Sequence, residues 1–339
     1  MQKRNSHFEI HFLTVLTLVY QAQLLYNETI YPSKHLVFYR KETVPMCKKF
    51  FKAIMTAAAV VSCALVMAFP VQAANVRTPV ADGTVTYGNS NLTVDASHTA
   101  DGYIMVKYSG KAPRVKVRIQ KDTLYTYDLN TNGSYETFPL TEGNGTYTVQ
   151  VFENVSGSTY STALNKQISV QISDPNSPFL RPNQFCNFNS SSAAMEMSDT
   201  LVSGISDTIK KVEAVYKYAV DNITYDYHKA ATVQSGYLPN VDNTLSTKTG
   251  ICFDYASLIT AMLRAQDVPT KLVIGYTGNV YHAWISVYTK QQGWIDNVIY
   301  FDGTSWKFMD ATFAASGKGD PAITEYINNP ANYQAKFSY

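Results

Sequence analysis

A chain of 339 residues is too long for one small domain and predicts about two. Hydrophobic residues make up 45% of it, which is enough for a sizeable core and argues against disorder over most of its length. The formal net charge is only +2, and the lysines and arginines are scattered, so composition gives no reason to expect a nucleic-acid partner.

The amino end has the pattern of a signal peptide. Lysines between residues 48 and 52 precede the apolar run 53–69, and small residues then suit cleavage after Ala73. We predict a signal peptide over residues 46–73 and interpret residues 1–45 as an extension from an upstream start. An uncleaved anchor helix is the alternative, although the run is slightly shorter than the ~20 residues that a bilayer needs. Both interpretations place the body of the protein outside the membrane. We therefore expect a secreted or cell-surface protein without a stable membrane span after cleavage.

Export determines how the cysteines are interpreted. Cys47 and Cys63 would leave with the signal, so the mature chain keeps Cys186 and Cys252. Two cysteines in a chain of this size do not make a disulfide framework, and we expect both to be free. A disulfide between them would prevent Cys252 from acting as a nucleophile.

Residues 83–173 have the pattern of an all-β domain. Short runs rich in Tyr, Thr and Val alternate with turn residues, and roughly seven strands in about 90 residues are typical of an immunoglobulin-like β-sandwich. No ionisable cluster stands out, so we expect this domain to act in spacing or binding rather than in chemistry. The clearest runs are 92–94, 103–108, 115–119, 146–152 and 167–172.

Prolines and serines in residues 174–194 indicate a linker, after which a second domain is predicted over residues 195–339. Ser206 can cap a helix there, because the apolar residues that follow recur on one helical face. Residues 226–249 have little periodicity and are predicted to be a loop that shapes a cleft. The helical face consists of Ile209, Val212, Val215, Tyr216 and Ala219.

A further helix is predicted from about Cys252, ending before Pro269, where a proline forbids continuation. Its buried side would consist of Ala256, Ile259, Met262 and Leu263. A helix followed by antiparallel strands makes this half of the chain α+β. The strand-like runs are 271–276, 281–287, 298–301 and 306–310.

Cys252, His282 and Asp310 follow one another in this half of the chain. A thiol, an imidazole and a carboxylate are the three groups of a cysteine acyl-transfer site. The free amides and partial positive charge of a helix N-terminus favour the thiolate of Cys252. His282 could accept the thiol proton while Asp310 fixes the imidazole tautomer. The Cys252 N–H is one candidate oxyanion donor, and Tyr225 and Trp284 are candidates for the second donor or for the cleft wall.

Each of these residues also has a purely structural interpretation. A cysteine at a helix start is usually a small buried hydrophobe, and a histidine or tyrosine on an apolar strand usually belongs to the core. The three candidate catalytic side chains are also admissible zinc ligands. No Cys-x-x-Cys or His-x-x-x-His pair accompanies them, and no calcium-loop pattern is apparent, so we predict no metal and no cofactor.

The segments Gly250-Ile251-Cys252, His282-Ala283-Trp284 and Met309-Asp310-Ala311-Thr312 together resemble the transglutaminase-like superfamily, a papain-related group that includes bacterial secreted members. The match runs from about Ile205 to Phe313. The resemblance implies a transglutaminase-like, cysteine-protease-like fold. It also implies that Cys252 is the nucleophile, His282 the general base and acid, and Asp310 the group that orients the imidazole. The long segment 293–305 between the second and third members departs from the pattern.

These features predict an exported cysteine enzyme that forms a thioester with the amide of a peptide or protein, which could belong to the cell envelope. Water as the acceptor gives a hydrolase, either a peptidase or an amidase. A lysine amine gives an acyltransferase that crosslinks proteins, and the sequence leaves the two open. The alternative is a non-catalytic cell-surface binding or assembly protein with a vestigial triad.

Overall fold

The computed structural model describes residues 74–296, 300–301, 306–307, 312, 315 and 329–339. The chain divides into two compact units, residues 1–69 and 70–339, and every described residue belongs to the second. The predicted signal peptide and the extension before it lie outside the described residues. Within the described ranges, no helix has the length and apolar character needed to cross a membrane.

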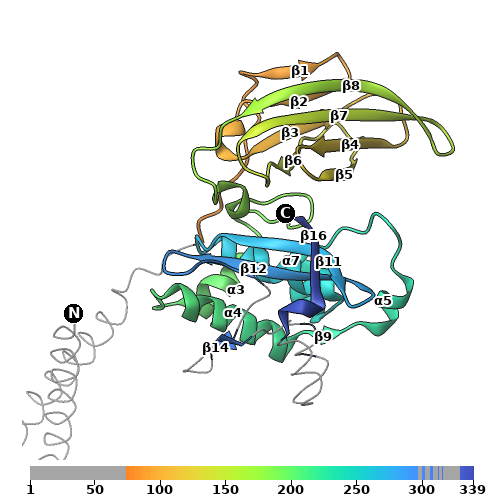
Figure 1. Ribbon diagram of the computed structural model, residues 1–339. Helices are drawn as coiled ribbons and strands as arrows, with labels where there is room; N and C mark the ends of the chain where they lie inside the picture. The colour runs from red at the N-terminus through yellow and green to blue at the C-terminus, as the bar shows by residue number, and fades with distance from the viewer. Residues whose placement is uncertain (1–73, 297–299, 302–305, 308–311, 313–314, 316–328) are drawn as a thin grey trace, which may run out of the picture. The chain divides into compact units, whose positions relative to one another are not determined.

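Residues 86–170 form two antiparallel sheets of four strands each (Figure 1). Along β5, Tyr125, Tyr127 and Leu129 are buried while the residues between them are exposed, which is the period of two expected of a strand with one face on a core. One sheet has the order β1-β2-β3-β6 and the other β5-β4-β7-β8. The strands are β1 (Thr86–Gly88), β2 (Leu92–Asp95), β3 (Tyr103–Tyr108), β4 (Val115–Gln120), β5 (Leu124–Leu129), β6 (Glu136–Pro139), β7 (Gly145–Ser156) and β8 (Thr159–Val170).

Strand β8 begins at Thr159, earlier than the predicted run 167–172. Its first half is mostly exposed and polar, so it lacks the apolar alternation from which a strand is predicted. Backbone pairing with β7, from Gly145 opposite Val170 to Ser156 opposite Thr159, holds it in the sheet.

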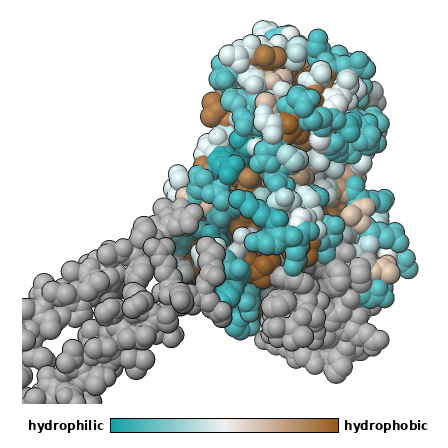
Figure 2. Space-filling view, turned by 60° about the vertical axis from the view of Figure 1, so that its left-hand side comes forward, coloured by the Kyte–Doolittle hydropathy of each residue, from teal (hydrophilic) through white to brown (hydrophobic). Residues whose placement is uncertain are grey.

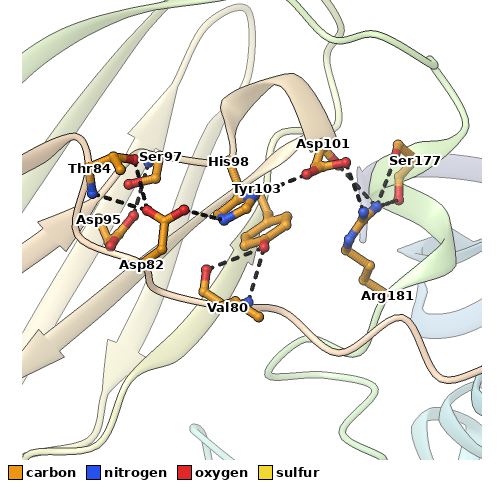
Figure 3. Close-up of polar contacts among 10 residues, drawn as sticks. All are labelled: Val80, Asp82, Thr84, Asp95, Ser97, His98, Asp101, Tyr103, Ser177 and Arg181. Atoms are coloured by element: carbon orange, nitrogen blue, oxygen red, sulfur yellow. Dashed lines mark hydrogen bonds and ion pairs between the residues drawn. The ribbon is translucent and has the colours of Figure 1, made fainter.

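The region of the two sheets contains a cluster of ionisable residues (Figure 3). The His98 ring lies between two carboxylates, with Nε2 3.2 Å from Asp82 and Nδ1 3.0 Å from Asp101. Arg181 donates to the other oxygen of Asp101 at 2.9 Å. Hydrogen bonds from Thr84 lower the pKa of Asp82 to about 2. No ionisable cluster stands out in the sequence of this region, because the fold brings together residues that are separated along the chain.

Residues 174–194, predicted to be a linker, are packed rather than free. The short helix η2 (Ser177–Leu180) is buried throughout, as is Cys186. The ring of Phe185 lies 5.7 Å from that of Tyr127 on β5 and 5.6 Å from that of Phe253, at the start of the helix α7 (Cys252–Arg264). The segment therefore joins the β-sheet region to α7 through aromatic contacts.

The remainder of the chain is mixed α and β. Helices α3 and α4 pack against α7, which also packs against β11 and β12 of a sheet with the order β13-β12-β11-β16 (Figure 1). The helices are α3 (Ala193–Val202), α4 (Thr208–Asn222), α5 (Tyr227–Thr232), α6 (Val241–Thr247) and α7. The strands are β9 (Thr224–Tyr225), β10 (Thr249–Gly250), β11 (Thr270–Thr277), β12 (Val280–Thr289), β13 (Gly293–Ile295), β14 (Tyr300–Phe301), β15 (Trp306–Lys307) and β16 (Tyr333–Ser338).

Two local predictions in this half need correction. Helix α4 is capped by Asp207, whose carboxylate accepts the Lys210 N–H at 3.0 Å, and not by Ser206. Residues 226–249, predicted to be a loop, contain α5 and α6, which are too short to show a hydrophobic period. The predicted runs 298–301 and 306–310 contain β14 and β15, and their other residues lie outside the described ones.

Helix α7 is buried on all sides. Every residue from Asp254 to Arg264 is buried, including the four predicted positions. Helices α3, α4 and α6 cover it on one side and β11 and β12 on the other. Elsewhere the surface is mixed, and apolar side chains are scattered among polar ones on the face that Figure 2 shows.

Arg264, the last residue of α7, is fully buried and binds backbone carbonyls from three segments. Its guanidinium donates to the carbonyl oxygens of Thr270 at 2.8 Å, Tyr339 at 2.6 Å and Arg181 at 2.5 Å. Burial lowers its pKa to about 10, so the group remains charged at neutral pH. Arg264 therefore fastens the end of α7 to the start of β11, the chain after β16 and the segment after η2.

Replacing Arg264 with Met is expected to lower the free energy of unfolding by about 3 kcal/mol, because three buried carbonyls lose their donor. Urea denaturation measures the change. Arg118→Met on the exposed face of β4 is the matched control and is expected to change stability by less than about 0.5 kcal/mol. Equal losses in the two variants would contradict this role of Arg264.

Candidate active site

Cys252 is the first residue of α7 and is half-buried. The preceding residue, Ile251, is extended at φ −94° and ψ 176°, and its N–H is bound by the Asp254 carboxylate at 2.8 Å. The thiol therefore lies at a helix N-terminus, where the unpaired amides and the helix dipole favour a negative charge on sulfur.

Gly250 allows Asp254 to fold back over the helix start. A Cβ atom at residue 250 would lie 2.6 Å from the Cβ of Asp254 and 3.1 Å from its Oδ2. Any larger residue at this position would displace the carboxylate from the Ile251 N–H. The glycine two residues before the cysteine thus has a steric function in shaping the first turn.

The Asp254 carboxylate is fully buried and bound by two further side chains. Lys229 on α5 donates to its Oδ2 at 2.6 Å, and the Tyr237 hydroxyl donates to its Oδ1 at 2.5 Å. Burial raises the pKa of Tyr237. Burial by itself would lower the pKa of Lys229, but the hydrogen bond and charge of Asp254 outweigh it, and the net pKa is raised. Sequence reasoning missed both partners, and only the acidic residue at the third helical position signalled a cap there.

His282 lies on β12, the strand against which α7 packs. It is buried, pairs with Gly275 of β11, and its ring stacks with that of Trp284 at 6.2 Å between centroids. The neighbouring residue Tyr281 is 56% exposed. Burial, and then the nearby Tyr276 and Cys252, raise the pKa of Tyr281. The structure therefore puts the candidate nucleophile and the candidate base on two elements in direct contact.

The other predicted site residues have different positions. Tyr225 is half-buried on β9, where it pairs with Gly250, two residues before the cysteine. Trp284 is buried behind His282 and contacts the ring of Tyr333. Asp310 lies outside the described residues. The suggested roles of these three residues remain predictions.

The two described cysteines differ in their surroundings, and neither is in a disulfide. Cys186 is fully buried, its sulfur lies 3.4 Å from the carbonyl oxygen of Ser257, and burial raises its pKa to about 12. Cys252 is the more accessible thiol. In the part of the chain that the structure describes, no three His, Cys, Asp or Glu side chains gather in a way that could hold a metal ion.

Residues 196–297 match the transglutaminase-like superfamily. This stretch contains Cys252, Asp254 and His282 together with α7 and β12. It is a transglutaminase-like domain of mixed α and β structure. The match starts before residue 205 and stops before residue 313, so its limits differ from those predicted from the motifs.

Curated relatives and solved structures resemble parts of the chain. YebA, an uncharacterised protein of Bacillus subtilis, is 30% identical over 130 residues, which are 32% of this chain and 17% of YebA. The chain therefore spans less than a fifth of that relative. A candidate cysteine protease from Cytophaga hutchinsonii aligns over 75% of this chain and 73% of its own, with 14% identity and a TM-score of 0.36. Red sea bream transglutaminase aligns over 67% and 53%, with 12% identity and a TM-score of 0.27.

Iodoacetamide is expected to label Cys252 in the native protein and Cys186 only after unfolding, because only Cys252 combines partial exposure with a helix N-terminus. Peptide mass spectrometry of protein labelled at neutral pH measures both sites. His282→Ala is expected to slow labelling of Cys252 about tenfold or more, since the imidazole would no longer stabilise the thiolate. Labelling of the native protein at Cys186 first would contradict this assignment.

Proposed function

We propose that this protein is an exported cysteine enzyme that acts on amide bonds of a peptide or protein through a thioester acyl-enzyme. The observation that carries the proposal is the position of Cys252 at the N-terminus of α7, with His282 on the strand packed against that helix. Both residues lie in the transglutaminase-like domain. A thiol at the start of a helix that packs against an imidazole-bearing strand supports nucleophilic acyl transfer, in which the base takes the proton of the thiol.

In the proposed reaction, His282 takes the proton of the Cys252 thiol, and the thiolate attacks the carbonyl carbon of the amide. Negative charge develops on the carbonyl oxygen, where the Cys252 N–H can stabilise it. The C–N bond then breaks as the His282 imidazolium protonates the departing amine, which leaves the acyl group on sulfur as a thioester. Asp310 would keep the imidazole aligned, and Tyr225 or Trp284 would complete the oxyanion site or the cleft wall.

The second half of the reaction depends on the acceptor. His282 would remove a proton from water or from an amine as either attacks the thioester, and the thiol would be regenerated. Water yields a carboxylic acid, whereas a lysine amine yields a new amide and a crosslink. Access of water to the cleft therefore determines whether the enzyme is a hydrolase or an acyltransferase.

The exposed surface next to the site suits a polymeric amide substrate. Tyr227, Val280 and Tyr281 are large, apolar and more than half exposed, and they adjoin β9 and β12. Side chains of this kind can pack against an extended peptide. Together with the signal-peptide pattern before residue 74, they support a substrate outside the cytoplasm, and we include the peptides and proteins of the cell envelope among the candidates.

The two sheets of residues 86–170 support the further proposal of a separate immunoglobulin-like sandwich preceding the catalytic domain. Their alternating burial and antiparallel order are the features of such a sandwich. In the proposed layout this domain presents or captures the substrate, and acyl transfer occurs in residues 195–339.

Cys252→Ala and His282→Ala are each expected to lower amide turnover about a thousandfold or more, because each removes a group needed for the thioester. The assay incubates the protein with cell-envelope extract and a fluorescent primary amine, and mass spectrometry detects both released amines and new amide links. Cys186→Ala is the matched control and is expected to retain turnover, since Cys186 is fully buried. Unchanged turnover in Cys252→Ala protein, or equal slow labelling of Cys252 with and without His282, would instead indicate a binding protein with a vestigial site.

A further inference from the structure

A buried negative charge lies in the same helical turn as the proposed nucleophile. Asp254 is two residues beyond Cys252 in the first turn of α7, and it is fully buried. Buried carboxylates are stable in proteins only when hydrogen bonds and an opposite charge compensate them. The Ile251 N–H, the Tyr237 hydroxyl and the Lys229 ammonium supply these contacts, at 2.8 Å, 2.5 Å and 2.6 Å.

Without compensation, this carboxylate would work against the thiolate. A negative charge in the first turn cancels part of the positive potential at the helix N-terminus and disfavours a second negative charge nearby. The Lys229 ammonium touches the same carboxylate oxygen that receives the Ile251 N–H, so it offsets the charge at its source. Interactions between charges this close are strong in a partly buried site.

The lysine is itself held in place. Its ammonium also donates to the Tyr237 hydroxyl at 2.6 Å and lies 4.3 Å from the centroid of the Tyr237 ring. The ring of Tyr237 contacts that of Phe253, the residue after Cys252, with centroids 6.4 Å apart. Helix α5 and the chain around residue 237 are thus fastened to the start of α7 at the two residues that follow the cysteine.

We propose that Lys229 is a positioning residue of this site: its ammonium, braced by Tyr237, neutralises the buried Asp254 carboxylate and so leaves the N-terminus of α7 able to stabilise the Cys252 thiolate. The inference rests on the proposed function only in taking Cys252 as the nucleophile. It assigns a role in the site to α5 and to residue 237, which the motifs around the cysteine do not include.

Other titratable groups lie on the elements around the start of α7 and are left unchanged by the test. Tyr225 and Asp226 lie at β9 and at the cap of α5, and Tyr281 and His282 lie on β12. Their contributions are common to all the variants below. Differences in the labelling midpoint between variants therefore measure the effect of the removed charge.

The test is the pH profile of iodoacetamide labelling of Cys252 in the full chain, which requires no substrate. Lys229→Met is expected to move the midpoint of the profile upward by about one pH unit, because an uncompensated carboxylate disfavours the thiolate. Lys229→Arg is expected to keep the midpoint near that of the unchanged protein, since it retains the charge. Tyr237→Phe is also expected to keep it there, because a hydrogen bond is lost but no charge.

Two further variants distinguish the loss of the Lys229 charge from damage to the fold. Lys217→Met removes a lysine paired with Asp221 at 2.5 Å on the exposed face of α4, and it is expected to leave the midpoint unchanged. The double variant Lys229→Met/Asp254→Asn removes both charges and is expected to bring the midpoint back to that of the unchanged protein.

An unmoved midpoint in Lys229→Met protein would overturn the proposal. A double variant whose midpoint is shifted as far as that of Lys229→Met would overturn it as well. If Lys229→Met protein does not fold, the double variant is compared with Asp254→Asn protein. In Asp254→Asn protein the ammonium of Lys229 has no carboxylate to neutralise, so its charge is expected to lower the midpoint relative to the double variant. Equal midpoints in these two variants would overturn the proposal.

Failure of this inference differs from failure of the proposed function. If Cys252 is not catalytic, amide turnover is absent and labelling does not depend on His282, yet the shift in Lys229→Met protein is still measurable. If the lysine has no electrostatic role, turnover and the effect of His282 persist while the midpoint stays fixed.

Discussion

The burial of α7 from Asp254 to Arg264 is the constraint on which the rest of this half of the molecule depends. A helix enclosed by other helices on one side and by a sheet on the other has no solvent to satisfy its ends, so protein groups must bind its first amides and last carbonyls. Asp254 binds the Ile251 N–H at the amino end, and the N–H groups of Ala265, Gln266 and Val268 bind carbonyls of the last turn, while the Arg264 side chain binds carbonyls of three other segments. The helix that begins with Cys252 packs against β12, the strand that carries His282. The same packing that stabilises the core therefore presents the thiol.

The sequence was sufficient to predict a helix or strand where the pattern that determines it is local. Strand β3 has the predicted limits, Tyr103–Tyr108, because its apolar residues are flanked by turn-forming ones. Helix α7 begins at Cys252 as predicted and ends at Arg264, before the proline at residue 269 that forbids continuation. The transglutaminase-like assignment likewise came from short motifs whose order was informative. Confirmation by the match over residues 196–297 applies to the family of this domain and not to the reaction that it catalyses.

Features that depend on distant residues were not predictable. The contacts of Lys229 and Tyr237 with Asp254 span 25 and 17 positions of sequence, and no periodic pattern marks them. The cluster around His98 draws on residues from Asp82 to Arg181, each of which is an ordinary surface type when considered alone. Ion pairs between residues distant in sequence are recognisable only once the fold has brought their members together. The error of one residue at the cap of α4 has another cause, because serine and aspartate are equally good caps and the local sequence offered both.

Arg264 has a consequence for how this scaffold can diverge. Its acceptors are main-chain oxygens, which every amino acid possesses, so these hydrogen bonds do not depend on which side chains stand at residues 181, 270 and 339. An arginine paired with a carboxylate would instead require two positions to be preserved together. A single arginine thus maintains a junction of three segments. The sequences of these segments can change while the helix that carries the cysteine keeps its orientation.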